Sequence, residues 1–516
     1  MDKLCRKIVV VGGGSAGWLL ASRLAKKLNV NDNAAFSVTV IESPDVSIVG
    51  VGEGTWPTMR QTLRKIGVKE TDFMRECCAA FKQGTKFVGW RDGGDQDFYY
   101  HPFDAPCGSN SYNAGDLWHK YKRPHSPDSF CAAVSPQYHT CEQGLAPKTI
   151  THGEYQGFLN YAYHLDAVKL VGFLRRHATK NLGVRLIEGN VLGVKKDENG
   201  WVDHLITREH GDLSGDIFFD CTGFNALLMH QNLDVPYSRL DDTLFVDRAL
   251  VMQVPYDSET APLASTTIST AHDAGWIWDI GLSDRRGVGF VYSSNHMNDE
   301  EALAGLRQYV GHKASSLPDR QIKFQARRLD RFWEKNVIAV GLSAGFVEPL
   351  EAAAIMMIET TADWFCERFP SSRHVMTLQS RIYNETFSGY WDRIVQFIKF
   401  HYVLSKRRTD FWKDNKCESS IPQDLLEKLK LWQYCAPFSQ DFLADSYVFS
   451  WQSFQYVYFG MGSSYDSASS NEYPEERVAF MKDFDMTKAM TKKALETLPS
   501  NRELLMKIRD FGLQQV

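Results

Sequence analysis

The chain has 516 residues, 43% of them hydrophobic and 23% charged, which is typical of a globular protein too long for one core. Its formal net charge of -5 and the absence of a polybasic run give no indication of nucleic-acid or membrane binding. No apolar run approaches the ~20 residues of a membrane span, and ten scattered cysteines predict neither a zinc site nor a disulfide framework. We therefore expect a cytoplasmic protein of two or three packed subdomains.

The first elements along the chain predict a dinucleotide-binding unit. Residues 8–11 form an apolar run typical of a buried strand, residues 18–28 have helical periodicity, and a second strand ends at Glu42. Between the first strand and the helix lies Gly12-x-Gly14-x-x-Gly17, whose glycines allow a tight turn, a close approach of backbone to a pyrophosphate, and close packing of helix on strand. The helix N-terminus then faces the anion, and Glu42 is placed to bind the adenosine ribose.

Further strands are expected at residues 184–187, 217–219 and 337–340, and helices at 355–369, 383–402 and 425–432. Residues 84–165 are rich in Tyr, His, Pro and Gly and predict irregular structure, and the serine-rich stretch 462–471 predicts a flexible loop. Two strands end in small-residue turns, at residues 220–223 and 341–345, as in flavoproteins of the hydroxylase type. This layout favours FAD over NAD. Because no second Gly-x-Gly-x-x-Gly occurs, electrons are expected from a separate reductase.

The predicted fold is therefore α/β, with a Rossmann-like FAD-binding domain, a mixed β-sheet substrate region and a C-terminal helical subdomain. Residues 1–350 would form a discontinuous FAD-binding module with substrate-region insertions around 84–165 and 230–300. Residues 351–516 would form a mainly helical subdomain that closes the substrate site.

Three segments identify a family. The run Gly275-Trp276-Ile277-Trp278-Asp279-Ile280 resembles the Trp-x-Trp-x-Ile-Pro signature of flavin-dependent tryptophan halogenases, with Gly281 in place of Pro. Phe81-Lys82 resembles the segment that carries the catalytic lysine of that family. Phe346 to Glu351 resembles the segment that carries its carboxylate partner. The resemblance covers roughly residues 5 to 462 and also includes Val49-Gly50-Val51-Gly52-Glu53.

The resemblance implies a set of ligands and contacts. The ligands are FAD, delivered reduced by a separate NAD(P)H-flavin reductase, a halide ion and a small indole-like aromatic molecule. No nucleic acid or membrane partner is implied, and a homodimer is left open. The implied cofactor-binding positions are Gly12, Gly14, Ser15, Ala16, Gly17, Glu42, Val51, Glu53, Val191, Leu342 and Ile355.

By the same resemblance Lys82 takes the oxidised halogen, as a haloamine or through a hydrogen bond to hypohalous acid, and Glu351 accepts the proton that leaves the ring. Lys86 and Glu348 are the local alternatives, and a lysine in a segment of mixed polarity is more often a solvated surface residue. The Trp276 and Trp278 pair is held to discourage monooxygenation, although two rings on one buried face explain it equally well.

The halide is expected at a helix N-terminus. Pro349 is compatible with a helix start, which would leave the N–H groups of residues 352–354 unpaired and attractive to an anion. The resemblance assigns halide binding to the backbone of Ala353 and Ala354. The family usually has Ser-Thr-Gly at residues 352–354, where this chain has three alanines, so backbone donors are kept and hydroxyl groups are lost.

The implied substrate walls are His101 and Phe103 on one side and Trp451 on the other, since flat aromatic side chains grip a flat ring by stacking. A lone histidine is more often a satisfied loop residue. Tryptophan-specific members carry a longer insert before the last tryptophan, with tyrosines and a glutamate that hold the amino acid. Here only Tyr434 and Tyr447 lie between Trp432 and Trp451, with no glutamate. The sequence therefore favours free indole or another indole without the amino-acid group over free tryptophan.

Two other functions stay open from the sequence. A related flavin monooxygenase or dehydrogenase without halide chemistry would explain Gly281 and the three alanines. A flavin-binding protein without turnover would explain the Gly-rich opening alone. The halogenase interpretation depends on Lys82 and Glu351 occurring together with the tryptophan pair.

Overall fold

The computed structural model describes residues 4–46, 52–121, 129–442, 448–466 and 474–515. The chain divides into two compact units, which are described separately. Unit 1 comprises residues 1–79, 165–240 and 325–391, and unit 2 comprises residues 80–164, 241–324 and 392–516. Helix α10 (Arg373–Val403) contributes residues to both units.

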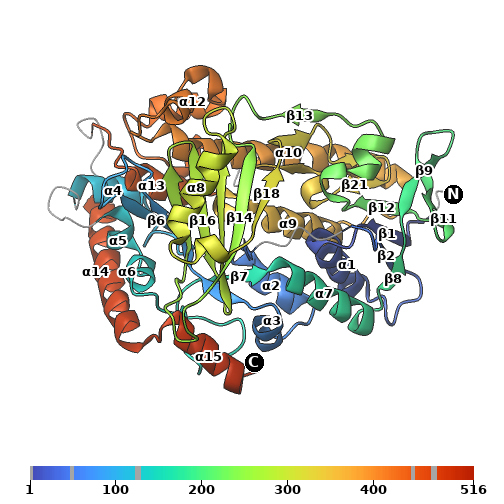
Figure 1. Cartoon of the computed structure of the whole chain (residues 1–516), viewed down its shortest axis with the longest axis horizontal. Coiled ribbons are helices and arrows are strands. Elements are labelled where there is room, and N and C mark those ends of the chain that lie inside the picture. Colours follow the sequence, from blue (N-terminus) through green and yellow to red (C-terminus); the bar gives the residue numbers. More distant parts are fainter. Residues whose placement is uncertain (1–3, 47–51, 122–128, 443–447, 467–473, 516) are drawn as a thin grey trace. The chain divides into compact units, whose positions relative to one another are not determined.

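Unit 1 is built on a six-stranded sheet in the order β20-β21-β12-β1-β2-β8 (Figure 1). Strand β1 lies parallel to β2 and β12, β8 extends the sheet parallel to β2, and β20 is antiparallel to β21. The strands span Lys7–Val11 (β1), Ser37–Glu42 (β2), Arg185–Glu188 (β8), Ile217–Asp220 (β12), Trp333–Glu334 (β20) and Val337–Ala339 (β21). Val10 and Val40 are fully buried, as expected for parallel strands covered on both faces.

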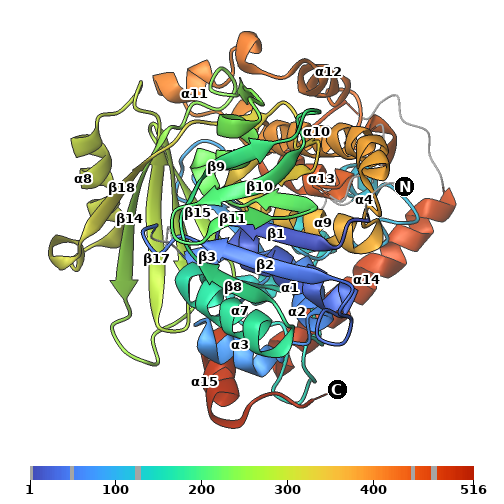
Figure 2. The same ribbon diagram turned by 90° about the vertical axis from the view of Figure 1, so that its right-hand side faces the viewer.

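Helix α1 (Ser15–Leu28) packs between α7 (Ala167–Asn181) and α9 (Ala353–Glu367), and Figure 2 shows α1 and α7 beside β1, β2 and β8. Helix α2 (Thr58–Lys65) packs on α9, and α3 (Glu70–Glu76) packs on α7. Two three-stranded sheets complete the unit. Their strands are Val191–Lys196 (β9), Val202–Thr207 (β10) and Gly211–Ser214 (β11), then Tyr237–Arg239 (β13), Arg327–Leu329 (β19) and Gly345–Phe346 (β22).

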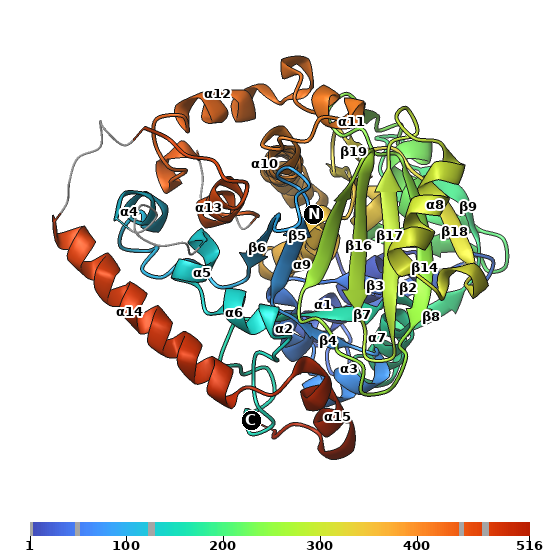
Figure 3. The ribbon, with the colours of Figure 1, turned by 60° about the vertical axis from the view of Figure 1, so that its left-hand side comes forward.

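Unit 2 contains a seven-stranded sheet in the order β18-β14-β17-β16-β15-β5-β6. Its strands span Gly84–Val88 (β5), Phe98–Pro102 (β6), Arg248–Pro255 (β14), Thr267–His272 (β15), Gly275–Gly281 (β16), Arg285–Tyr292 (β17) and Asp319–Lys323 (β18). All neighbours are antiparallel except β15 and β5, which run parallel. Helix α8 (Asp299–Val310) covers β14 and β17 (Figure 3), over a core that includes Met252, Ile277 and Phe290.

The rest of unit 2 is largely helical. Strands β4 (Ala80–Lys82) and β7 (Ala162–Asp166) are antiparallel neighbours in a further three-stranded sheet. Helix α13 packs on β6, and the long helix α14 runs along α5 and α6 (Figure 3). The helices span Ala114–Tyr121 (α4), Phe130–Val134 (α5), Gln137–Glu142 (α6), Asp410–Asp414 (α11), Gln423–Leu431 (α12), Trp451–Gly460 (α13), Pro474–Thr497 (α14) and Asn501–Phe511 (α15).

Three sequence predictions need correction. Residues 84–165 are rich in loops as expected, but they also contain β5, β6, three helices and most of β7. Helix α10 begins at Arg373, ten residues before its expected start at 383. The sequence did not predict these first turns because they are largely exposed and lack an apolar stripe. The chain does not divide at 350/351, because α9 packs on α1 within unit 1. Part of the expected loop 462–471 lies outside the described residues.

Candidate active site

The predicted glycine-rich turn in unit 1 has the shape that a dinucleotide requires. Gly12 has φ +111°, and a Cβ there would lie 2.2 Å from the carbonyl oxygen of Cys221. A Cβ at Gly17 would lie 2.0 Å from the Gly12 carbonyl oxygen, so the helix sits tightly on the turn. In contrast, no heavy atom lies within 4 Å of a Cβ at Gly14. The turn is therefore packed behind Gly12 and Gly17 and open at Gly14, where a pyrophosphate would approach.

The N-terminus of α1 and the end of β2 complete this part of the site. Helix α1 begins at Ser15, and no side chain caps its free N–H groups. Glu42 is held by two neighbours: Trp18 donates its Nε1–H to Glu42 Oε2 at 3.0 Å, and Arg175 pairs with Glu42 Oε1 at 2.9 Å. The residues fit a bound dinucleotide, with an uncapped helix end for the phosphates and a fixed carboxylate at the ribose position.

The two small-residue turns come together in unit 1. Ser343 donates a hydrogen bond to the fully buried Asp220 at 3.1 Å, which joins the end of β12 to the turn after β21. A Cβ at Gly341 would lie 2.9 Å from the Cβ of Ala16, so the second turn lies against the start of α1 and places Leu342 beside it. This convergence supports the prediction that both segments return to one cofactor.

The remaining predicted cofactor positions lie on other elements of unit 1. Ile355 is buried near the start of α9, and Val191 is half-buried in β9. Burial raises the pKa of Glu53 to about 7, although the residue keeps some exposure. Val51 lies outside the described residues.

The backbone before α9 is strained. Glu351 (φ 65°) and Ala352 (φ 54°) are consecutive non-glycine residues in the left-handed region, within a short 3₁₀ turn from Leu350 to Ala352. Trp56 donates its Nε1–H to the carbonyl oxygen of Glu351 at 2.8 Å, which holds this turn. The side chains of Glu351 and of its alternative, Glu348, are both buried.

The expected helix start at Pro349 is wrong, because α9 begins at Ala353 and the N–H of Ala352 donates to the Pro349 carbonyl oxygen at 3.1 Å. The N–H groups of the first helical residues, Ala353 and Ala354, fall at the N-terminus of α9, which has no side-chain cap. Ala353 is buried and Ala354 is exposed. The two predicted halide positions therefore remain at a helix end that attracts anions.

In unit 2, Lys82 is a buried side chain. It is 1% exposed, and its Nζ lies 5.3 Å from the centre of the Phe103 ring. The backbone after Lys82 is fixed, because Gln83 donates its N–H to the Ser265 carbonyl oxygen at 2.7 Å and its own carbonyl oxygen accepts from the Phe103 N–H at 3.0 Å. The alternative lysine, Lys86, is partly exposed and forms an ion pair with Glu142 at 2.5 Å. Lys86 is therefore the ordinary, partly solvated surface lysine of this segment, and Lys82 is not.

The two tryptophans of the predicted signature lie on one face of β16. Trp276 and Trp278 have ring centres 6.2 Å apart, and both side chains are buried. Trp278 stands opposite Gly289 in β17, where a Cβ would lie 2.0 Å from the indole ring. Gly289 therefore makes the space that Trp278 occupies, a requirement that the sequence alone did not reveal.

The predicted substrate walls gather around β6 in unit 2. His101 lies on β6, Phe103 follows it, and Trp451 begins α13, which packs on β6. The ring of His101 lies 5.5 Å from Phe397 and 6.1 Å from Tyr456, two aromatic neighbours that the sequence analysis missed. They lie on helices hundreds of residues away, so no local pattern connects them to His101.

The segment before Trp451 offers few groups to an amino-acid substrate. Tyr434 is 67% exposed, and Tyr447 lies outside the described residues. The Asp441 carboxylate is already used, since it accepts hydrogen bonds from Trp432 Nε1 and from the Phe438 N–H, both at 2.8 Å.

The sequence as a whole matches a known family. Residues 7–471 match the family model described as tryptophan halogenase. The chain belongs to the tryptophan halogenase family. The structure is similar to a crystal structure of a tryptophan halogenase from Shewanella frigidimarina, with a TM-score of 0.96 and 41% identity over 100% of both chains.

Two relatives with named activities are similar along nearly their whole length. The tryptophan 6-halogenase SttH of Streptomyces toxytricini is 33% identical, covering 96% of this chain and 97% of its own. The tryptophan 7-halogenase RebH of Lentzea aerocolonigenes is 30% identical, covering 97% of this chain and 98% of its own. The family consists of flavin-dependent halogenating enzymes that act on small aromatic substrates and use a halide together with FADH2 from a separate flavin reductase.

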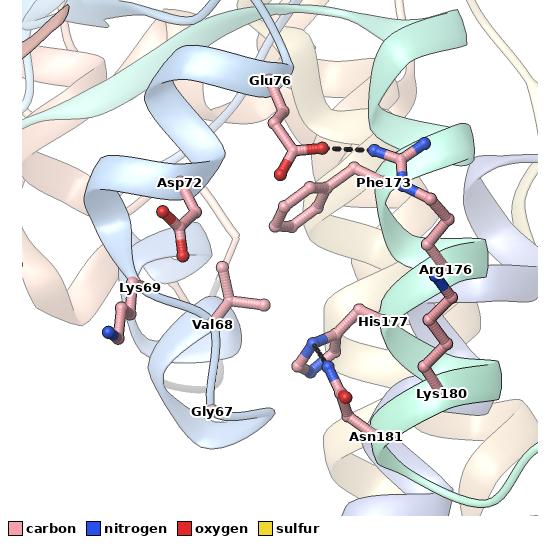
Figure 4. A pocket seen from close by; sticks show the side chains of 10 residues that line it. All are labelled: Gly67, Val68, Lys69, Asp72, Glu76, Phe173, Arg176, His177, Lys180 and Asn181. Carbon is pink, nitrogen blue, oxygen red and sulfur yellow. Dashed lines mark hydrogen bonds and ion pairs between the residues drawn. The ribbon is translucent and has the colours of Figure 1, made fainter.

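Other features of the halogenase lie outside this site. Among the described residues no helix is both long and apolar enough to cross a membrane. A pocket of about 360 Å³ lies between α3 and α7 in unit 1 (Figure 4), and no predicted site residue lines it. Its polar side chains serve the packing of the two helices, because Arg176 pairs with Glu76 and His177 contacts the Ile66 carbonyl oxygen at 2.8 Å.

Proposed function

We propose that this halogenase transfers an oxidised halogen to an indole-like ring through Lys82, and that it prefers an indole without a free amino-acid group. The observation that carries the proposal is the burial of Lys82, at 1% exposure, with its nitrogen against the face of Phe103. Removing an ammonium from water is costly, so burial of this kind favours the neutral amine that the chemistry needs.

The residues of unit 1 bind the cofactor and the halide. Bound reduced FAD and O2 supply the oxidising power that converts a halide into hypohalous acid. The turn at Gly12 to Gly17 and the N-terminus of α1 would hold the pyrophosphate, and Glu42 the ribose. The N–H groups of Ala353 and Ala354 would hold the halide, because the start of α9 carries partial positive charge. Backbone donors suffice here, so the loss of two hydroxyl-bearing residues does not remove the site.

Lys82 then directs the halogen. Its amine takes the halogen from hypohalous acid and presents it to the ring, and burial keeps bulk water away from the reactive species. Lys86 is not suited to this step because its ammonium is neutralised by Glu142 at 2.5 Å. Glu351, whose side chain is buried, accepts the proton that the ring loses.

The substrate is held by flat aromatic side chains rather than by charge. His101 and Phe103 supply one wall and Trp451 another, which suits any indole. A tryptophan zwitterion needs partners for its ammonium and carboxylate. In the described part of the segment before Trp451, Asp441 is already engaged and Tyr434 points to solvent. SttH and RebH are named for two different ring positions, so similarity to them does not fix the position modified here.

The test combines the protein with FAD, a flavin reductase, NADH, bromide, and either indole or tryptophan, followed by mass spectrometry. We expect brominated indole at a kcat/KM at least ~10-fold above that for tryptophan, since unpartnered charges of a zwitterion cost at least ~1.4 kcal/mol. Lys82→Ala should abolish brominated product and leave FAD binding and hypohalous acid formation intact. Lys86→Ala, the matched control, should retain activity.

Each part of the proposal has its own contrary result. Brominated product at the wild-type rate in Lys82→Ala would remove the lysine from the chemistry. A preference for tryptophan would contradict the substrate class. A hydroxylated product without a brominated one would favour monooxygenation, the alternative function.

A further inference from the structure

A buried histidine stands beside Lys82 in unit 2. In the antiparallel pair of β4 and β7, Ala80 is opposite His164 and Lys82 is opposite Ala162. Residues two apart on a strand share a face, so Lys82 and His164 are diagonal neighbours on the same face of this pair. Both are inside the protein, with 1% of Lys82 and 0% of His164 exposed.

His164 shares strand β7 with a buried carboxylate, Asp166, two residues later. The Nε2 of His164 lies 2.8 Å from the hydroxyl oxygen of Thr267 in β15. The backbone of Gly281, at the end of the tryptophan-bearing strand β16, favours the protonated form of the ring through a hydrogen bond. The ionisable group that acts on His164 is Lys82 from β4.

Electrostatics allow this pair only one positive charge. Burial, and after it the charge of Lys82, hold the pKa of His164 well below its usual value, so the ring is neutral near pH 7. A second positive charge beside that of Lys82 is therefore disfavoured in this dry interior. A neutral imidazole beside an ammonium is a proton acceptor in position.

We propose that His164 receives the proton that Lys82 must lose before its amine can take the oxidised halogen. This inference rests on the proposed function of Lys82. First the Lys82 ammonium gives H⁺ to His164, leaving a neutral amine and an imidazolium. The amine then attacks hypohalous acid: an N–X bond forms, the O–X bond breaks, and the hydroxide leaves with one N–H proton as water. Finally the N–X bond breaks as the ring takes X, and the nitrogen takes back the imidazolium proton to become a neutral amine. The ring gives its proton to Glu351, and exchange of that proton through solvent restores the ammonium of Lys82.

Strand geometry explains why a histidine suits this position. The proton needs to move only between adjacent strands, and Thr267 can orient the ring through its hydroxyl group. An aspartate at residue 164 would instead pair with the ammonium and stabilise the protonated lysine, which is the unreactive form. His164 acts on the substrate only through Lys82 and is thus a positioning and proton-handling residue.

The test compares wild type, His164→Gln and His272→Gln between pH 6 and pH 9, with FAD, reductase, NADH, bromide and indole. His272 is the matched control, because it is a largely buried histidine of unit 2 whose charged neighbours are Asp273 and Arg407 rather than Lys82. Brominated indole is measured by mass spectrometry, and hypohalous acid by a β-diketone that traps it. For His164→Gln we expect unchanged hypohalous acid formation and ~10²-fold less brominated indole at pH 7, recovering as pH rises because hydroxide replaces the imidazole. His272→Gln should follow the wild-type profile.

A bromination rate in His164→Gln that parallels wild type at every pH, or one reduced equally at every pH, would overturn the proposal. A second measurement does not depend on the variant folding. The imidazole ¹⁵N resonances of His164 in the wild-type protein should be those of a neutral ring at pH 7, and a protonated ring would overturn the proposal. If wild type brominates no indole at any pH, the proposed function itself fails, which is a distinct result.

Discussion

The two units present their predicted functional groups in different ways. In unit 1 the groups are mostly backbone N–H donors at the starts of α1 and α9, exposed by a turn at Gly14 and by a strained turn at Glu351 and Ala352. In unit 2 they are buried side chains on strands, with Lys82, Trp276 and Trp278 all nearly inaccessible. Function in unit 1 should therefore depend on backbone shape, and function in unit 2 on side-chain identity.

This difference explains how the chain departs from the family pattern. The three alanines at residues 352–354 stand where the family pattern has Ser-Thr-Gly, and the proposed halide site in unit 1 uses only their N–H groups. Lys82 and the tryptophan pair keep the family residues in unit 2. Gly281, in place of Pro, ends β16 opposite Arg286 and leaves the buried tryptophans unchanged.

The largest expected effect tests backbone shape in unit 1. Gly12→Ala should destabilise the protein by at least ~3 kcal/mol and prevent FAD binding, because its Cβ meets a backbone oxygen at 2.2 Å in a left-handed conformation. Gly14→Ala, with no atom within 4 Å of its Cβ, should keep the wild-type melting temperature and weaken only FAD binding. Thermal unfolding and FAD titration measure both. Equal losses of stability in the two variants would contradict the shape argument.

The next-largest effect concerns Glu351 on the strained turn, the residue of unit 1 whose side chain, rather than its backbone, is proposed to act. Glu351→Gln should slow bromination ~10²-fold without changing FAD affinity, since the amide keeps the shape and loses the proton acceptor. Glu348→Gln is the matched control, being buried three residues earlier. Steady-state bromination of indole distinguishes them. If Glu348→Gln is the slower variant, the proton acceptor is Glu348.

The sequence predicted best what depends on local pattern. The strand, glycines, helix and acid from residue 8 to Glu42 follow one another without interruption, and the structure confirms each element. Local pattern was less informative at residues 84–165, where the strands are short and part of their pairing is with distant segments. Strand β5, for example, pairs with β15 about 180 residues later, which no short window can detect.

The environment of Lys82 could not be read from the sequence for the same reason. Lys82 and Lys86 lie in similar segments, and their difference depends on β7, 80 residues later, and on Glu142. His164, in the run Tyr161 to Asp166, has no motif that marks it. The family resemblance selected the lysine, whereas its buried neighbour appears only when the strands are paired.

The third prediction concerns the buried carboxyl group of Glu359 in unit 1 and its effect on the pH dependence of stability. Burial raises the pKa of Glu359 to about 7 from 4.5, while Thr58 donates a hydrogen bond to it at 2.8 Å. Because the folded pKa exceeds the unfolded one, stability falls as pH rises from about 4.5 through about 7. Glu359→Gln should remove this loss and exceed wild-type stability at pH 8 by ~1–3 kcal/mol, with little difference near pH 5. The exposed Glu385→Gln should keep the wild-type profile, and a Glu359→Gln profile equal to it would refute the prediction.

The smallest effect separates backbone strain from backbone donors at the halide position. Ala352 has φ 54°, a conformation that costs a residue with a Cβ ~1–2 kcal/mol and costs glycine little. Ala352→Gly should therefore stabilise the protein by ~1 kcal/mol, less the entropy that glycine loses on folding. Because the N–H groups of Ala353 and Ala354 stay in place, the KM for bromide should change less than ~2-fold. A tenfold change would correspond to ~1.4 kcal/mol, so the expected change in binding energy is small. Thermal unfolding and bromide kinetics measure the two effects independently. A large rise in the bromide KM would mean that the strained conformation of residue 352 itself holds the N–H donors in position. The contrast between unit 1 and unit 2 would then depend on backbone conformation as much as on which chemical groups each unit presents.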